Sequence, residues 1–316
     1  MRKAELLIAG VVTLAAAVGL YWTGDSPTSS SPQSSGHVGG PAQSTEPLPQ
    51  EDGGLGPIEI LPSDNERLEA AGTRDFRNKY SSAVMVTTKG PLEVAECSGV
   101  MVSPRLVLTA GHCVCVPKIS DAAREVKATS IDGATCTGQA TVITLLYGTV
   151  RNMRVADFKV RVYAGTIRPH PDLQVVFDNS GTALSARADL ALIFLDEPVE
   201  DDIPSAMLAD TEVRADESLV MVGYGYDKNT GGIYGARYFR TNKLASRQEP
   251  SNGRFIYEQQ GPYVYNGFSG GPCFREQKTG RWLVGISSLG TDKELAFNST
   301  IFFGAWIRSE IQRSLE

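Results

Sequence analysis

The chain has 316 residues, a formal net charge of -6 and a hydrophobic share of 41%. These values are typical of one or two globular domains and exclude a disordered or fibrous protein. The mild acidity, and a sequence without a basic block, P-loop, Rossmann fingerprint or metal-ligand pattern, predict no nucleic-acid partner, no metal and no cofactor.

The N-terminus begins with Arg2 and Lys3, followed by a continuous apolar run at residues 6–22, LLIAGVVTLAAAVGLYW. This length is short for a membrane span and long for the core of a secretory signal. Residues 1–22 are therefore either a signal peptide or an N-terminal membrane anchor. Because the positive residues precede the run, we expect the rest of the chain to be exported. It would be secreted, periplasmic or anchored in the cell envelope, with residues 6–22 as the tether if they are kept.

Residues 23–75 are predicted to form a flexible linker. Ser, Thr, Pro and Gly account for 23 of the 35 residues at 23–57. Such a segment buries too little apolar area to offset the entropy lost on ordering. One globular domain is then expected at residues 76–316.

Short apolar strands separated by Gly, Pro and Asn turns fill this domain. The predicted strands are residues 82–88, 105–110, 141–147, 158–163, 190–195, 218–225 and 282–287. Strands of this length without intervening helical periods indicate an all-β antiparallel sandwich or barrel. The end of the chain differs, because Ile307, Ile311 and Leu315 recur every four residues and predict one C-terminal amphipathic helix.

A serine lies in the glycine-rich bend Gly267-Phe268-Ser269-Gly270-Gly271. By itself such a bend is equally well explained as a tight turn. A serine hydroxyl becomes a nucleophile when a base, usually a histidine held by a third group, removes its proton. His112 ends an apolar strand in VLTAGHCV, and Asp189 precedes another in ARADLALIFLDEP. Each residue alone would be a packing, capping or turn residue, but the three together predict nucleophilic catalysis.

These segments, together with CSGVMVSPRLVLTAGHC, IRPHPDL, GYG, GFSGGP and LVGISSLG, resemble the chymotrypsin/trypsin-like serine peptidase family. The motifs occur in the family's His, Asp, Ser order and extend from about residue 80 to the C-terminus. The resemblance implies two six-stranded antiparallel β-barrels with the active site between them. It also implies a protein or peptide substrate.

Carried over residue by residue, the resemblance implies that Ser269 is the nucleophile and His112 its general base. Asp189 would orient the imidazole, and Ser288 would support the aspartate. The backbone N–H groups of Gly267 and Ser269 would form the oxyanion hole.

The five cysteines allow at most two disulfides in an oxidising compartment. Cys97 and Cys113 match the family's bridge across the histidine loop. Cys115 and Cys136 would staple a loop if they bridge. Cys273 is expected to be buried and unpaired, and not a second nucleophile.

The chain departs from the family at three places in and around the active site. Phe268 stands where members activated by cleavage have an aspartate that pairs with a new N-terminus, and no Ile-Val-Gly-Gly-like start is present. We expect Phe268 to order the loop by packing into the core. Tyr263 replaces the carboxylate that selects Arg or Lys, whereas Gly290 matches a pocket-wall glycine that leaves room for a side chain.

The third departure is the spacing of 77 residues between His112 and Asp189, which is longer than usual for the family. We expect the extra residues at 115–157. Asn298-Ser299-Thr300 also fits a glycosylation sequon.

The sequence thus predicts an exported serine endopeptidase that acts through an acyl-enzyme and needs no N-terminal cleavage. The alternatives are a catalytically inactive peptidase-fold binding module, which Phe268 and Tyr263 keep open, and an esterase that uses the same triad.

Overall fold

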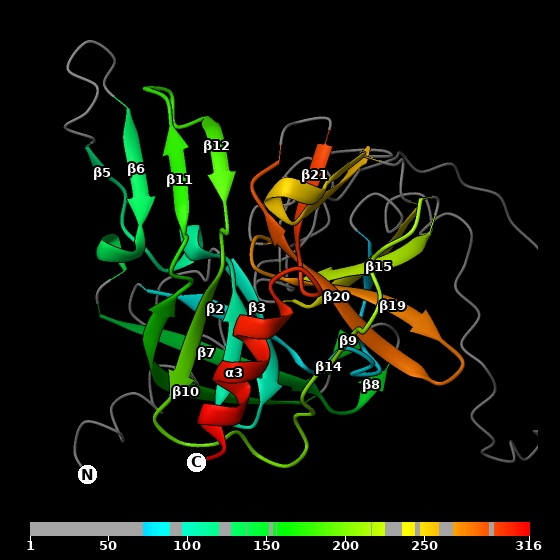
Figure 1. Cartoon of the computed structure of the whole chain (residues 1–316). Coiled ribbons are helices and arrows are strands. Elements are labelled where there is room, and N and C mark those ends of the chain that lie inside the picture. The colour runs from blue at the N-terminus through cyan, green and yellow to red at the C-terminus, as the bar shows by residue number, and fades with distance from the viewer. Residues whose placement is uncertain are drawn as a thin grey trace, which may run out of the picture.

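The computed structural model of the chain describes residues 72–88, 97–119, 128–136, 138–151, 154–155, 157–215, 217–224, 236–243, 247–258, 268–290 and 294–316. The predicted signal or anchor and nearly all of the predicted linker lie outside these residues. None of the helices in the described ranges has the length and apolar character needed to span a bilayer. The described part is mostly β, with one closed barrel, a second large sheet, a small separate sheet and a C-terminal helix (Figure 1).

Six antiparallel strands close the first barrel, as predicted for this half of the domain. In hydrogen-bonded order they are β10 (Phe158–Pro169), β13 (Ala191–Leu195), β4 (Leu106–Thr109), β3 (Cys97–Ser103), β2 (Ala83–Thr87) and β7 (Gln139–Tyr147). β2, β3 and β4 are buried at every residue, which fits strands whose inner side chains fill the barrel and whose outer side chains are covered by neighbouring elements. Closure leaves no sheet edge, so the ends of β4 and β13 have fixed positions.

The second half of the domain forms one large sheet. Its strands, along the hydrogen-bonded path, are β1 (Thr73–Arg74), β16 (Tyr238–Lys243), β15 (Ser218–Gly223), β19 (Pro272–Gln277), β20 (Gly280–Ser288), β21 (Glu294–Ser299), β18 (Arg254–Glu258) and β17 (Arg247–Glu249). A ninth strand, β14 (Met207–Leu208), lies off this path and pairs with β20 in parallel.

The prediction that this second sheet is also a closed six-stranded barrel is not confirmed. A barrel requires its first and last strands to pair. Within the described ranges the first strand of the path, β1, pairs only with β16, and the last strand, β17, pairs only with β18. The path therefore has two open ends. Residues 244–246, which join β16 to β17, lie outside the description.

A separate four-stranded sheet stands beside the first barrel (Figure 1). Its order is β12 (Ala183–Arg187), β11 (Gln174–Phe177), β6 (Thr129–Asp132) and β5 (Lys118–Ile119). It accounts for much of the long spacing between His112 and Asp189. The β11–β12 hairpin supplies half of this sheet from residues 174–187, and the expectation that the extra residues lie at 115–157 stays a prediction. The same interval holds the small β8 (Val150–Arg151) and β9 (Arg154–Val155) pair.

The predicted C-terminal helix is present as α3 (Gly304–Ser314). Ile307 is buried against the first barrel and Ile311 is partly buried there, as their spacing predicts. Leu315 lies beyond the last helical residue and is 66% exposed, so the apolar stripe is one residue shorter than expected. Arg168 on β10 and Glu310 on α3 form an ion pair of 2.6 Å that fixes the helix to the barrel.

One hydrophobic core joins the barrel to the second sheet. Leu106 and Leu108 of β4 pack in the same buried cluster as Val222 of β15, Ile286 of β20 and Ile307 of α3. Fully burying a side chain of this kind contributes about 1.5–3 kcal/mol. The shared core holds the two sheets against each other at the place where β4, β15 and β20 meet.

Candidate active site

His112 is held in a single 3-10 turn, η1 (Gly111–Cys113), directly after β4. Directly before it, Gly111 leaves room for Leu173, because a Cβ on Gly111 would lie 2.6 Å from a methyl group of that side chain. On its other side Cys113 forms the expected disulfide with Cys97 at the start of β3. A loop of that size, closed by a disulfide, is stabilised by about 3 kcal/mol. The histidine is therefore fixed on both sides by the closed barrel.

Asp189 lies at the same end of the barrel as His112. β4 and β13 pair antiparallel with Thr109 opposite Ala191, so the residues just after β4 and just before β13 meet. Ala188 adopts a positive φ of 44° in the bend just before Asp189. The carboxylate is completely buried, with 0% exposure.

The buried Asp189 carboxylate accepts hydrogen bonds from both neighbouring functional residues. Its Oδ2 accepts from the Nδ1 of His112 and from the Oγ of Ser288, each at 2.7 Å, and its Oδ1 accepts from the backbone N–H of His112 at 2.8 Å. Burial opposes the negative charge, but the electrostatic attraction of His112 and these hydrogen bonds outweigh it and lower the pKa of Asp189. The aspartate is thus a carboxylate, and it holds the Nδ1 side of the His112 ring.

Ser269 lies in a turn whose main chain is hydrogen-bonded to both sheets. Its carbonyl accepts from the N–H of Ser98 on β3 at 2.8 Å. Gly270 donates its N–H to Ser287 on β20 at 2.8 Å, and Gly271 accepts from Ser287 at 2.9 Å. Gly270 has a φ of +78°, and a Cβ there would lie 2.2 Å from Ser98 O and from Thr109 Oγ1. The glycines after the serine are therefore required by close packing of main chain on main chain.

The turn that carries Ser269 lies beside the segment that carries His112. A Cβ on Gly270 would be 3.0 Å from the backbone nitrogen of Ala110, two residues before the histidine. Between these described residues there is no hydrogen bond from Ser269 Oγ to His112, and the Nε2 of His112 lies 3.9 Å from Cys113 Sγ. Such catalytic hydrogen bonds are often long in unliganded sites and tighten when substrate binds. The structure thus brings His112 and Ser288 into contact with Asp189, and it packs the turn that carries Ser269 against the segment just before His112.

Comparison with known families gives a match to the trypsin-like peptidase domain over residues 97–286. This interval covers more than half of the chain and contains the histidine, the aspartate and the serine just described. The chain belongs to the trypsin-like peptidase family. A search of curated proteins found no match. Membership supports a serine protease-type function with a protein or peptide as substrate.

Two of the residues predicted for this trypsin-like site, Gly267 and Tyr263, lie outside the described residues. Gly290 is described and lies just beyond β20, exposed to solvent. A Cβ on Gly290 would come within 2.1 Å of the carbonyl oxygen of Glu294. The close approach of the Glu294 backbone therefore requires a glycine at residue 290, independently of any specificity pocket.

Phe268, the residue before the serine, is buried with 1% exposure in the core of the second sheet. Gly223 of β15 makes room for it, because a Cβ there would be 2.9 Å from the Phe268 ring. The trypsin-like domain thus buries an aromatic ring at the position where cleavage-activated members have an aspartate. Burial of this ring is what the packing hypothesis for Phe268 requires.

Sequence reasoning missed a function for Asn298. Its side-chain amide donates to the backbone oxygen of Asp189 at 2.9 Å, and the residue is 1% exposed. The glycosylation interpretation of the sequon at residues 298–300 is therefore wrong, because a buried amide is not accessible as an acceptor. Only the register of β21 against β20 brings Asn298 to the aspartate, so no local sequence signal could have revealed it.

The remaining cysteines also lie near the site. Cys115 and Cys136 form the second expected disulfide, at the base of the four-stranded sheet. Cys273 is free and buried, and its burial raises the pKa of the thiol to about 12. It is thus a protonated core residue, as predicted. The sulfur atoms of Cys97 and Cys113 next to His112 are joined in a disulfide and offer no thiolate to a metal.

Proposed function

We propose that the chain is a serine endopeptidase that hydrolyses peptide bonds through an acyl-enzyme. The observation that carries the proposal is the buried Asp189 carboxylate, which binds Nδ1 of His112 at 2.7 Å and so directs the other ring nitrogen outward as a base. The turn of Ser269 packs against the segment that precedes this histidine. A nucleophile, a base and an orienting group then lie in neighbouring positions, as acyl transfer requires.

In the proposed reaction His112 Nε2 takes the proton of Ser269 as its Oγ attacks the substrate carbonyl. Asp189 stabilises the imidazolium, which then gives the proton to the leaving amine, and the acyl-enzyme is hydrolysed by a water activated by the same base. The N–H groups of Gly267 and Ser269 would bind the oxyanion. Loss of one such donor typically lowers the rate by roughly 100- to 1000-fold.

The proposed enzyme is active without N-terminal cleavage. Packing of Phe268 into the core beside Gly223 supports this, because burial of a phenylalanine contributes about 2–3 kcal/mol and orders the loop without a new N-terminus. Tyr263 in place of a pocket carboxylate further predicts that the substrate residue before the cut is not Arg or Lys. Export, with or without a tether at residues 6–22, is proposed from the sequence of the N-terminus alone.

A fluorophosphonate probe, which reacts with activated serines, tests the proposal on the full chain. We expect the uncut protein to be labelled, and labelling to be lost in Ser269→Ala and in His112→Ala. Turnover of a peptide library, and not of esters alone, separates a peptidase from an esterase. Labelling only after proteolysis would show that cleavage is needed.

The proposed role of His112 as the base also predicts how the labelling rate depends on pH. We expect the rate of labelling to fall between about pH 8 and pH 5, since an imidazolium cannot accept the serine proton. A constant rate over this range would exclude His112 as the base.

A binding module without catalysis is the second candidate. The specific observation in its favour is that, in the described residues, Ser269 and His112 make no hydrogen bond. No labelling of either cut or uncut protein, with the fold intact by circular dichroism, would support it over the peptidase.

A further inference from the structure

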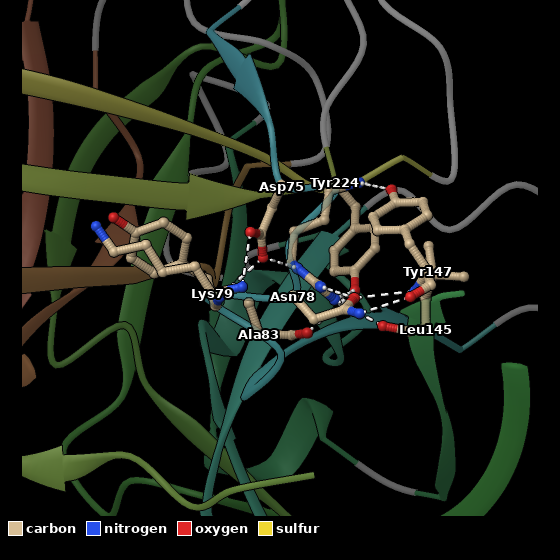
Figure 2. Close-up of polar contacts among 9 residues, drawn as sticks. Asp75, Asn78, Lys79, Ala83, Leu145, Tyr147 and Tyr224 are labelled. Carbon is tan, nitrogen blue, oxygen red and sulfur yellow. Dashed lines mark hydrogen bonds and ion pairs between the residues drawn. The ribbon is translucent and has the colours of Figure 1, made fainter. Parts of the chain in front are cut away.

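The largest fully buried side chain in the described part of the molecule is a charged one, Arg237, at 0% exposure. Every nitrogen of its guanidinium group donates a hydrogen bond. Nε donates to Asp75 at 2.8 Å, Nη1 to the Leu145 carbonyl at 2.7 Å and to the Tyr224 hydroxyl at 2.8 Å, and Nη2 to Asn78 at 2.9 Å. Figure 2 shows these partners converging from separate parts of the chain. A buried cation this fully paired has one defined position.

Asp75 ties the start of the domain to this arginine. Its carboxylate accepts the backbone N–H groups of Lys79 and Tyr80, each at 2.8 Å, in addition to Nε of Arg237. The backbones are joined as well, because the Asp75 N–H donates to the Arg237 carbonyl at 2.9 Å. Asp75 is 1% exposed and Arg237 is 0% exposed, so the pair is shielded from water. At Asp75 the uncut start of the domain is therefore joined to the core by an ion pair and a backbone hydrogen bond to the same arginine.

Tyr224 continues the contacts from Arg237 toward the serine turn. Its hydroxyl accepts from Arg237 and donates to the Ala83 carbonyl at 3.1 Å. Its backbone N–H donates to Ser98 Oγ at 2.9 Å, and the N–H of Ser98 in turn donates to the carbonyl of Ser269 at 2.8 Å. A continuous series of buried hydrogen bonds thus leads from Asp75 to the main chain of the proposed nucleophile.

The residue before Tyr224 makes a second connection. Gly223 lies directly against the Phe268 ring, with an added Cβ only 2.9 Å from it. The Gly223–Tyr224 pair therefore touches the serine turn on both sides, through Phe268 before the serine and through Ser98 at its carbonyl. A shift of Tyr224 would move both supports together.

We propose that Arg237 and Tyr224 are positioning residues for Ser269, through which the uncut start of the domain at Asp75 sets the shape of the serine turn. This rests on the proposed function of Ser269 as the nucleophile. An internal arginine–aspartate pair would then do what a newly released N-terminus does in cleavage-activated members. This arginine–aspartate pair would act on the serine turn through Gly223 and Tyr224. The pair is already formed in the uncleaved chain.

The neighbouring Tyr147 offers a matched control. Its hydroxyl accepts the backbone N–H of Arg237 at 2.9 Å, and the residue is buried at 9% exposure. Within the described ranges Tyr147 makes no hydrogen bond of its own to Ser98 or to the serine turn, and it also hydrogen-bonds with Asn78. Tyr224→Phe and Tyr147→Phe thus each remove one buried hydroxyl beside Arg237, and only the first lies on the route to Ser269.

The test compares the two variants in the full chain, at a temperature well below the Tm of both. We expect Tyr224→Phe to lower kcat about 10-fold with KM changed less than about 2-fold, and Tyr147→Phe to change kcat less than about 2-fold. The pH dependence of the rate should be unchanged in both, because neither variant touches Asp189 or His112. Equal kcat values for the two variants, or a loss that follows their Tm values, would overturn the inference.

Hydrogen exchange separates this inference from the proposed function. The Ser98 amide, which donates to Ser269, should exchange at least about 10-fold faster in Tyr224→Phe and at the wild-type rate in Tyr147→Phe. If the wild-type chain neither labels nor turns over peptides, the proposed function fails while this comparison still decides the coupling. Unchanged exchange at Ser98 in Tyr224→Phe would overturn the coupling even in an active enzyme.

Discussion

His112 and Asp189 are fixed by side-chain bonds at one edge of a closed barrel, whereas Ser269 is fixed by main-chain hydrogen bonds to two different sheets. The side of the proposed base, His112, is called the base side and uses a buried carboxylate and a disulfide. The side of the proposed nucleophile, Ser269, is called the nucleophile side and uses glycines that let backbones approach within contact distance. The two sides should therefore fail in different ways, the first when a charge or donor is removed and the second when atoms are added.

The largest effect is expected on the base side. Asp189→Asn keeps the size of the side chain but turns one oxygen into a donor, which favours the wrong tautomer of His112. A wrong tautomer in this arrangement lowers kcat by about 10,000-fold. Ser288→Ala removes only one of the hydrogen bonds to the same carboxylate and should lower kcat by about 10-fold. Steady-state rates for the two variants check this order, and a Ser288→Ala loss as large as that of Asp189→Asn would contradict it.

The nucleophile side is tested by adding one methyl group. Gly270→Ala and Gly181→Ala both place an L-residue at positive φ, +78° and +82°, which costs about 1–2 kcal/mol. At Gly181 no atom lies within 4 Å of the new Cβ, whereas at Gly270 two oxygens lie 2.2 Å away. Overpacking adds about 1–3 kcal/mol. We expect Gly270→Ala to lose about 2–5 kcal/mol of stability and its labelling, and Gly181→Ala to keep its labelling. Denaturant unfolding measures the difference, and equal losses would show that the close contact at Gly270 is relieved.

The smallest effect concerns a histidine outside the site. His170 packs edge-on against Phe303 and Trp306, and burial lowers its pKa from the usual value, with Asp172 acting against this shift. Its neutral form is favoured in the folded state. As pH falls below about 6.5, the unfolded chain takes up this proton first, so stability should decrease until the lower folded pKa is passed. His170→Gln should remove this part of the slope of Tm against pH. If the variant keeps the wild-type slope of Tm against pH, the acid sensitivity comes from other groups.

Much of the base side could be predicted from the sequence because its parts are local. His112 and Cys113 are adjacent, and Asp189 lies just before its own strand. Each of these residues can therefore be recognised within one continuous motif, TAGHC or DLAL. The disulfides, the first barrel, the terminal helix and the free Cys273 were predicted from such short patterns. The four-stranded sheet was not predicted, because β11 and β12 join β5 and β6 across a gap of about 40 residues that no local pattern spans.

The long-range supports of Asp189 and of the serine turn could not be predicted, since each joins segments far apart in the chain. Asn298 reaches Asp189 from 109 residues away, and Arg237 reaches Asp75 from 162 residues away. In sequence Asn298 resembled a glycosylation site, and Arg237 had no motif at all. The role of a fully buried polar group can be inferred only from its hydrogen-bond or ion-pair partners, because burying the group without a partner would be strongly unfavourable.

By itself the sequence determined the family, five of the six strands of the first barrel and the residue types able to carry the chemistry, because these depend on short-range patterns of apolar, glycine and polar residues. The Cys97–Cys113 pair was implied by the family resemblance. Only the tertiary structure decided that Asp189 is a buried carboxylate bound by His112 and Ser288, and that an internal arginine–aspartate pair leads to the main chain of Ser269. Hydrogen bonds act over about 3 Å, so contacts between distant segments exist only after β4, β15 and β20 have packed around one core.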